Sequence, residues 1–287
     1  MDEFAVISRA RAFVREINST AIPAPIQAYL HKVNGNAKCD NALKPGEGGY
    51  SFESKGVFFI RVNGNDGTER QNYTICHEIA HKVLALPTEH ESGPWWSYAK
   101  RSPNEIACDT FAAELLLPYH VFKPLAELTE FGFEALGRLA DRFEASLSAT
   151  GSRFATVLDA PCACVLAEQG TIRYAARSKS LREAGGWISP RSPLPGVSLA
   201  EKLRVGSNYS GPLQIAADRW FDNWTRGGEG LEDAKHFRDW DQTLSLIWFE
   251  DEEVPAPKRS AREEEEEMGL RPLDGILPWS GKSRRRR

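Results

Sequence analysis

The chain lacks the features that mark membrane, secreted and nucleic-acid-binding proteins. No apolar run among its 287 residues approaches the ~18–20 residues that a membrane-spanning helix needs. Met1-Asp2-Glu3 does not have the basic and then apolar pattern of a signal peptide. The formal net charge of −4 gives no general attraction for nucleic acid. We therefore expect a cytoplasmic protein with no membrane partner and without direct nucleic-acid binding.

Cysteine is scarce and odd in number, which argues against a disulfide framework. The five cysteines, mostly in apolar runs, are Cys39, Cys76, Cys108, Cys162 and Cys164. This usage predicts reduced thiols that pack as small core residues. Cys162-Ala163-Cys164 has no matching cysteine pair or histidine cluster nearby, so we do not expect a second metal site there.

Histidine is also sparse, yet two of the six histidines fall in His77-Glu78-Ile79-Ala80-His81, an HExxH pattern. Residues four apart share one face of a helix, with Cβ atoms ~5–6 Å apart. Both imidazoles can then bind one zinc ion at ~2.0–2.1 Å, with Glu78 beside the ion. The alternative is two core histidines bonded to backbone carbonyls.

The sequence around the pattern predicts a helix. Thr68 and Gln71 have the spacing of a capping box, so we expect the helix to begin at Thr68. Pro87 prevents its continuation. Apolar residues lie on more than one face of this segment, which indicates a buried helix.

A second predicted helix, over residues 104–117, supplies an acidic ligand. Ser102-Pro103 precedes it as an N-cap with proline in the first turn. Glu105 near its start can bind the metal, and Asp109, one turn later, can accept the free ring N–H of a ligand histidine. Glu114 is the competing ligand, but the i, i+4 pairing of carboxylates favours Glu105.

These two segments resemble the ImmA/IrrE family of bacterial metallopeptidases. The resemblance rests on residues 70–81, which run into HEIAH, and on residues 105–118, which are similar to the family's E-x-E-A-N-x-F-A-A-E-L-L-M-P block. It is specific over about residues 57–155. By this resemblance the zinc ligands are His77, His81 and Glu105, and the catalytic glutamate is Glu78.

The departures from the family block are mild. Ala107 stands where the family has its second glutamate, Asp109 replaces the asparagine, and Leu117 replaces the methionine. None of the three is a proposed ligand. The resemblance therefore implies a catalytically competent site.

The predicted mechanism is peptide-bond hydrolysis. Three protein ligands leave the fourth position of tetrahedral zinc for water, as in catalytic sites. Glu78 would take the proton of this water and pass it to the departing amine. A group that stabilises the oxyanion is also expected. The candidates are His90, Tyr98, Tyr119 and His120, although a structural or surface role explains each of them better than a catalytic one.

The fold class that we expect is α+β, in an ordinary globular chain large enough for two domains. A zincin-like (gluzincin) metallopeptidase domain with a helical extension covers residues 1–155. A smaller mixed α/β domain covers residues 156–253. The tail, residues 254–287, holds five consecutive acids and four consecutive bases, which predicts disorder.

Within the first domain, residues 4–18 and 24–33 have helical spacing, and residues 56–62 form a β-branched, aromatic strand. This strand either pairs with an extended substrate or is an ordinary core strand. Residues 122–128 form a further short helix. Residues 133–153 resemble a helix-turn-helix, but their charges alternate in sign, so we expect a packing element rather than a DNA reader.

In the second domain, residues 162–166 and 172–176 predict a hairpin around Gln169-Gly170, and residues 213–217 and 243–249 predict further strands. By the family resemblance this region is a sensor-like domain similar to a GAF fold. From its residues alone, a β-rich lid or a dimerisation module fits equally well.

Two functional classes follow. The first is a zinc endopeptidase whose substrate, by the resemblance, is a helix-turn-helix transcriptional repressor cleaved in a stress or mobile-element response. Manganese is an alternative metal, since two imidazoles and a carboxylate bind either ion. The second is a noncatalytic regulator that binds such a transcription factor without cleaving it. The intact Glu78 favours the enzyme.

Overall fold

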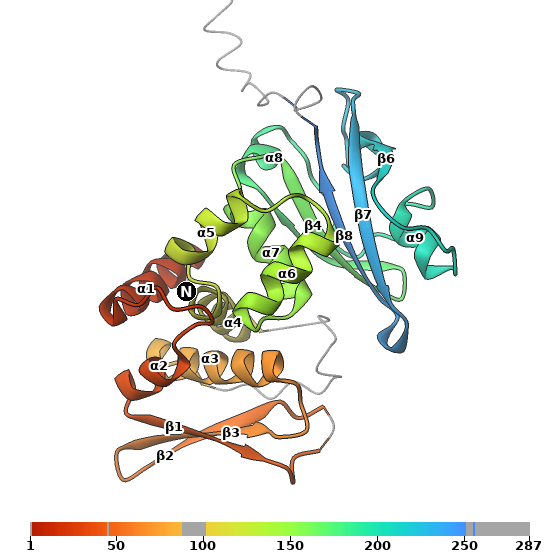
Figure 1. The fold of residues 1–287 in the computed structure, drawn as a ribbon. Helices are drawn as coiled ribbons and strands as arrows, with labels where there is room; N and C mark the ends of the chain where they lie inside the picture. The colour runs from red at the N-terminus through yellow and green to blue at the C-terminus, as the bar shows by residue number, and fades with distance from the viewer. Residues whose placement is uncertain (1, 45, 88–101, 251–254, 256–287) are drawn as a thin grey trace, which may run out of the picture.

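The computed structural model describes residues 2–44, 46–87, 102–250 and 255, which form a mixed α+β fold with two sheets (Figure 1). The α-helices are α1 (Glu3–Ile17), α2 (Ile26–Lys32), α3 (Thr68–Leu84), α4 (Pro103–Leu116), α5 (Tyr119–Glu127), α6 (Phe133–Phe143), α7 (Leu147–Val157), α8 (Lys179–Glu183) and α9 (Leu199–Arg204). The strands are β1 (Gly35–Asp40), β2 (Gly49–Ser54), β3 (Val57–Asn63), β4 (Cys162–Glu168), β5 (Thr171–Arg177), β6 (Leu213–Ala216), β7 (Glu229–Phe237) and β8 (Gln242–Trp248).

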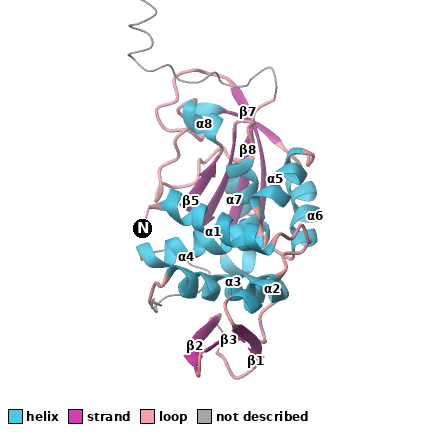
Figure 2. Ribbon diagram, turned by 90° about the vertical axis from the view of Figure 1, so that its left-hand side faces the viewer, coloured by secondary structure: helices cyan, strands magenta, loops and turns pink. Residues whose placement is uncertain are grey.

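The smaller sheet has the strand order β1-β3-β2, with β1 parallel and β2 antiparallel to β3. Helices lie on one side of this sheet only (Figure 2). Because β3 has neighbours at both edges, it cannot add a substrate strand. The prediction that residues 56–62 pair directly with substrate is wrong. They are a core strand, which buries Phe58, Ile60 and Val62.

Helix α3 lies over the inner face of this sheet and packs against α4, which in turn packs against α1. It begins at Thr68 as predicted, but the predicted capping box between Thr68 and Gln71 does not form. Gly67 is the N-cap, and no side-chain cap is made. Gln71 instead donates from Nε2 to the carbonyl of Asp66 at 2.7 Å. For α4 the predicted cap is confirmed, because Ser102 Oγ accepts from the backbone N–H of Glu105 at 3.3 Å.

Strand β2 begins in close contact with its neighbours. A Cβ atom on Gly49 would lie 2.3 Å from the carbonyl oxygen of Arg61 in β3 and 2.8 Å from Cγ2 of Thr74 in α3. Both distances are too short for real carbon atoms, so only glycine fits without movement. This close packing sets the inner side of β2, which carries Ser51, against α3.

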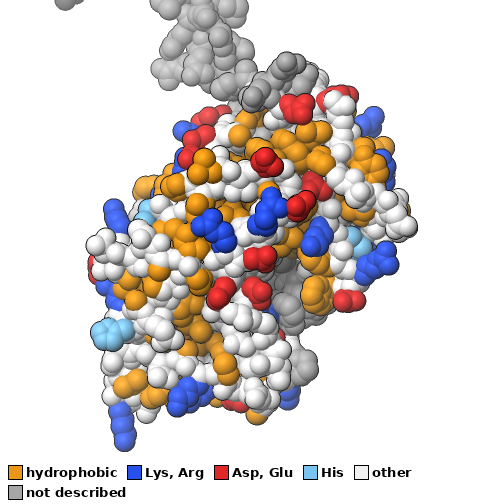
Figure 3. Space-filling view, viewed as in Figure 1, with side chains coloured by type: hydrophobic (Ala, Val, Ile, Leu, Met, Phe, Trp, Pro, Cys, Tyr) orange, Lys and Arg blue, Asp and Glu red, His pale blue; other side chains and the backbone are white. Residues whose placement is uncertain are grey.

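The helix pair α6 and α7 is a packing element. Leu136, Leu139 and Phe143 are buried, and α7 packs against β4 and β5 of the larger sheet. The turn places Glu144 in the left-handed conformation with φ 49°, at the position where a glycine is usual. Acidic and basic side chains are interspersed on the face in Figure 3, with no extended basic region there.

The larger sheet has the order β5-β4-β8-β7-β6, and every pair is antiparallel. It contains the predicted hairpin and both predicted later strands. Alternate residues of β4 enter two different cores: Cys164 and Leu166 join the core that includes α3 and α4, and Val165 faces the core on the other side. One face of this sheet is therefore continuous with the core of the first half. The domain boundary at residue 155 stays a prediction.

All five cysteines are free thiols, and four are buried; Cys39 is exposed. Packing as small core residues is therefore the right description for all but Cys39. No helix in the described part of the chain is both long and apolar enough to cross a membrane.

Candidate metal centre

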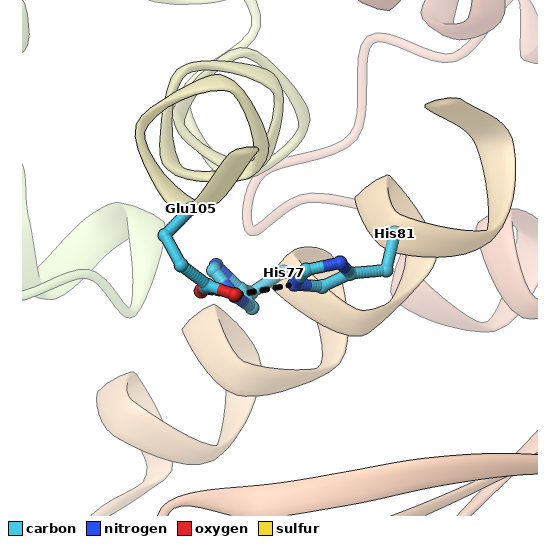
Figure 4. A group of neighbouring side chains, drawn as sticks. All are labelled: His77, His81 and Glu105. Atoms are coloured by element: carbon cyan, nitrogen blue, oxygen red, sulfur yellow. Dashed lines mark hydrogen bonds and ion pairs between the residues drawn. The ribbon is translucent and has the colours of Figure 1, made fainter. Parts of the chain in front are cut away.

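The structure brings His77, His81 and Glu105 together. The two histidines lie one turn apart on α3, and Glu105 reaches them from the first turn of α4 (Figure 4). The Nε2 atoms of the two rings are 3.0 Å apart. The Glu105 carboxylate lies 3.0 Å from Nε2 of His77 and 3.4 Å from Nε2 of His81. Within the described residues, no other His, Cys, Asp or Glu side chains form such a group.

These distances fit a metal ion. In a tetrahedron with bonds of ~2.0–2.1 Å, neighbouring ligand atoms lie about 3.3 Å apart. The spacings of 3.0–3.4 Å are close to this value. The donor set of two imidazoles and one carboxylate is also that of zinc sites with an open position.

The opposite side of each ring is held by a hydrogen bond. Nδ1 of His77 lies 3.1 Å from Oδ1 of Asp109, and Nδ1 of His81 lies 3.2 Å from the carbonyl of Leu86. Tyr73, one turn before His77, donates its hydroxyl proton to the same Asp109 oxygen. A proton held at Nδ1 leaves the Nε2 lone pair free, so these contacts select the tautomer that binds a metal.

The acidic groups around the two histidines favour positive charge at this site. Burial lowers the pKa of His77, but its hydrogen bonds with Asp109 and Glu105 outweigh burial and raise the pKa to about 9. The pKa of His81 is also raised, because hydrogen bonds with Cys108 and Glu105 outweigh its desolvation. Across the 3.0 Å contact, however, the two Nε2 atoms cannot both carry a proton. His77, His81 and Glu105 could hold a divalent cation, which would satisfy both lone pairs and the carboxylate.

Glu78 is buried beside this group and does not belong to it. Its Oε2 accepts a hydrogen bond from the hydroxyl of Ser51 in β2 at 2.5 Å. Its charge acts on His77 as one of the smaller causes that raise the pKa of that ring, after burial and the hydrogen bonds named above. The carboxylate is thus anchored by the sheet and lies close enough to His77 to act on its pKa.

Glu114, the competing ligand, lies in a different network. It is 2% exposed and pairs with Arg153 at 2.5 Å and with Arg11 at 3.4 Å. Its Oε1 accepts from the backbone N–H of Tyr119 at 2.9 Å. With two guanidinium groups as partners, this carboxylate is already neutralised, and Glu105 is the acid of the histidine group.

Two of the candidate oxyanion stabilisers, Tyr119 and His120, make other contacts. The Tyr119 ring lies under the Arg11 guanidinium, 4.1 Å from it, and Nε2 of His120 is bonded to the carbonyl of Ser19 at 3.1 Å. His90 and Tyr98 fall outside the described residues.

Two residues of the site were missed by the sequence predictions. Ser51 lies in a short strand whose two aromatic residues, Tyr50 and Phe52, are exposed, so the strand gives no signal of a buried face. Tyr73 precedes His77 by four residues, and this spacing could have indicated that it shares the face of His77 and contacts the Asp109 carboxylate.

The fold and the ligand group are those of a metallopeptidase-like domain. Residues 43–155 match the family model Peptidase_M78, described as the IrrE N-terminal-like domain. This match confirms the resemblance over residues 43–155, which form an IrrE N-terminal-like domain. A solved structure described as a Mycobacterium tuberculosis transcriptional regulator is similar over 86% of this chain and 76% of that chain, with a TM-score of 0.55 and 14% identity. At this identity the similarity concerns the fold alone. No curated protein matches the chain.

Proposed function

We propose that the chain is a zinc-dependent endopeptidase with a zincin-like (gluzincin) catalytic domain. The observation that supports this most is the group of His77, His81 and Glu105, with Nε2 and carboxylate atoms at the spacing of metal ligands. These three residues would hold the ion, with manganese as the alternative metal. When bound, the ion would supply Lewis acidity and lower the pKa of a water molecule towards ~7.

The chain's own residues then have distinct tasks. Glu78 would accept the proton from the attacking water and return it to the departing amine. The Ser51 hydroxyl would keep that carboxylate oriented, since it bonds only one of its two oxygens. Asp109 and the Leu86 carbonyl would hold the two rings with Nε2 towards the ion.

Strand β2 is the proposed substrate edge. It is the outer strand of the smaller sheet, and none of the described strands pairs with its other side. Ser51 on this strand contacts Glu78, so a peptide that extended the sheet along β2 would pass beside the general base. This assigns to β2 the role that the sequence suggested for β3.

The substrate that we propose is a helix-turn-helix transcriptional repressor, bound in the cytoplasm and cleaved in response to stress or to mobile-element induction. The family assignment of residues 43–155 supports this, and the similar solved structure is described as a transcriptional regulator. In the same proposal, residues 156–253 form a sensor-like domain similar to a GAF fold, and residues 254–287 form a solvated tail.

The decisive experiment separates metal binding from hydrolysis. The full chain, loaded with zinc, is incubated with a helix-turn-helix repressor encoded beside it, and cleavage is followed by mass spectrometry. Glu78→Gln should lower the rate by about 10²–10⁴-fold while one zinc per chain remains bound. His77→Ala should lose the zinc. Glu69→Gln, an exposed acid in the first turn of the same helix, should change neither.

The same experiment tests the alternative of a noncatalytic regulator. That alternative predicts tight binding of the repressor by the parent and by Glu78→Gln, with no cleavage by either. Equal cleavage by both would show that Glu78 is not the general base.

A further inference from the structure

The outer face of the smaller sheet, turned away from α3, carries a row of aromatic rings. Phe52 of β2 and Phe59 of β3 are direct cross-strand partners, with ring centroids 5.3 Å apart and planes inclined by 20°. Tyr50, two residues before Phe52, stacks on it at 6.2 Å and 26°. Tyr50 and Phe52 are 39% and 42% exposed. Large apolar surface of this kind at a sheet edge calls for an explanation.

The position of this row relative to the candidate general base is fixed by the pleat. Successive side chains of a strand point to opposite faces. Tyr50 and Phe52 therefore point outward, whereas Ser51 between them points inward and contacts Glu78. The two rings thus flank, along the strand, the residue that faces the site.

The row can be extended in one direction only. On the far side of β3, the residue opposite Phe59 is Asn36 of β1, which is not aromatic. On the near side the row ends at β2, which has no further partner among the described strands. A strand added along β2 would place a side chain directly opposite Phe52 and another opposite Tyr50. In either strand direction, directly opposite residues share one face of a sheet.

We propose that this row selects the substrate: the bound segment has apolar, preferably aromatic, side chains at the two positions that flank the residue opposite Ser51. This inference rests on the proposed endopeptidase function. The two outward side chains extend the stacks of Phe52 and Tyr50, and the residue between them faces Glu78. Cross-strand aromatic pairs favour binding, so each matched position should raise affinity about two- to five-fold.

A peptide library tests this inference with the intact, zinc-loaded chain. Peptides from a digested proteome are incubated with the parent, and cleavage sites are read by mass spectrometry. We expect apolar residues to be enriched at two positions separated by one residue. The enrichment should disappear in Tyr50→Ser/Phe52→Ser and persist in Tyr209→Ser, a control in which a tyrosine of 47% exposure outside this sheet is removed. Phe52→Leu, which keeps the strand apolar, should retain the aliphatic preference.

A substrate-side measurement avoids dependence on folding of the variants. Two synthetic peptides that differ by Phe or Ser at one flanking position are compared. The parent should favour the Phe peptide about two- to five-fold, through KM rather than kcat, and Phe52→Ser should remove this ratio.

The outcomes separate the two proposals. If the parent cleaves peptides but its preference is the same in Tyr50→Ser/Phe52→Ser, the substrate inference fails and the endopeptidase stands. If the parent neither binds nor cleaves any peptide, both fail. If the parent sediments as a dimer that Phe52→Ser dissociates, a second copy occupies the edge and the substrate inference is overturned.

Discussion

Helix α4 carries two glutamates that have different partners. Glu105, in its first turn, lies beside the imidazoles of His77 and His81. Glu114, near its end, is 2% exposed and held by the guanidinium groups of Arg153 and Arg11. Glu105 thus belongs to a group of three side chains that could hold a metal ion, whereas Glu114 is paired with two cations of the chain.

The comparison shows that burial and residue type do not decide which acid is functional. Both glutamates lie in the family-like block, and both are largely removed from water. The difference is in the partners. Removing a buried carboxylate from fixed guanidinium partners leaves a buried charge without its partner, whereas a carboxylate within 3.0–3.4 Å of two imidazole nitrogens could hold a metal ion with them.

The largest effect that would test this comparison is the loss of metal in Glu105→Gln. An apparent zinc affinity near 12 kcal/mol, shared by three ligands, gives about 4 kcal/mol each, or about a thousandfold in Kd. Competition with a fluorescent chelator measures this. Glu114→Gln should leave the Kd within a few-fold, and a comparable loss there would end the distinction between the two acids.

Glu114→Gln should instead lower the free energy of unfolding. It leaves Arg153, 11% exposed, without its counter-charge, which costs about 3 kcal/mol. Urea denaturation of the metal-free chain gives the value. Glu127→Gln removes one of the surface partners of Lys123 and should cost far less, because solvent screens such a pair. Similar losses in the two variants would show that the Arg153 pair is not special.

The next effect concerns the carboxylate that orients His77. Asp109→Ala should weaken zinc binding about 10–100-fold, because the Nδ1 proton loses its acceptor. Asp109→Asn keeps an acceptor oxygen and is the residue of the family block, so its effect should stay under about ten-fold. Chelator competition at constant pH distinguishes the two. Equal affinities in both variants would remove Asp109 from the site.

The smallest effect is that of the cap that begins α4. Ser102→Ala removes the side-chain acceptor for the Glu105 N–H and should cost about 1 kcal/mol of stability. Ser146→Ala removes the equivalent cap of α7, where Ser146 Oγ accepts from Ala149, at a similar cost. Thermal unfolding should shift equally in both, but only Ser102→Ala should also weaken zinc binding. Unchanged zinc affinity in Ser102→Ala would mean that the cap does not position Glu105.

The sequence predicted that His77, His81 and Glu105 come together, because short spacings along the chain indicate the two helices that carry them. His77 and His81 are four apart, and Ser102-Pro103 marks the start of the helix that carries Glu105. Helical periodicity also located α1, α2 and the α6 and α7 pair. In each case the signal is a spacing of three or four residues, which needs no knowledge of the tertiary fold.

The predictions from sequence failed for the features that depend on contacts between distant segments of the chain. Strand β1 is largely polar, and β7 mixes charged and small residues, so neither has a clear alternation. In β2 only Tyr50 and Phe52 alternate with polar residues, and both are exposed, so they do not mark a buried face. Without β1 and β2, β3 could not be recognised as the central strand. Ser51 could not be linked to Glu78 either, because their contact depends on how β2 packs against α3.

Gly49 makes the geometry of the substrate edge sensitive to one methyl group. Any side chain there would meet Arg61 and Thr74, so β2 would have to lift from the helix beneath it. The ligand triad, held by α3 and α4, would keep its arrangement. Gly49→Ala should therefore still bind a metal ion but hydrolyse peptides slowly. A substitution at residue 49 would change the catalytic rate and leave the metal affinity unchanged.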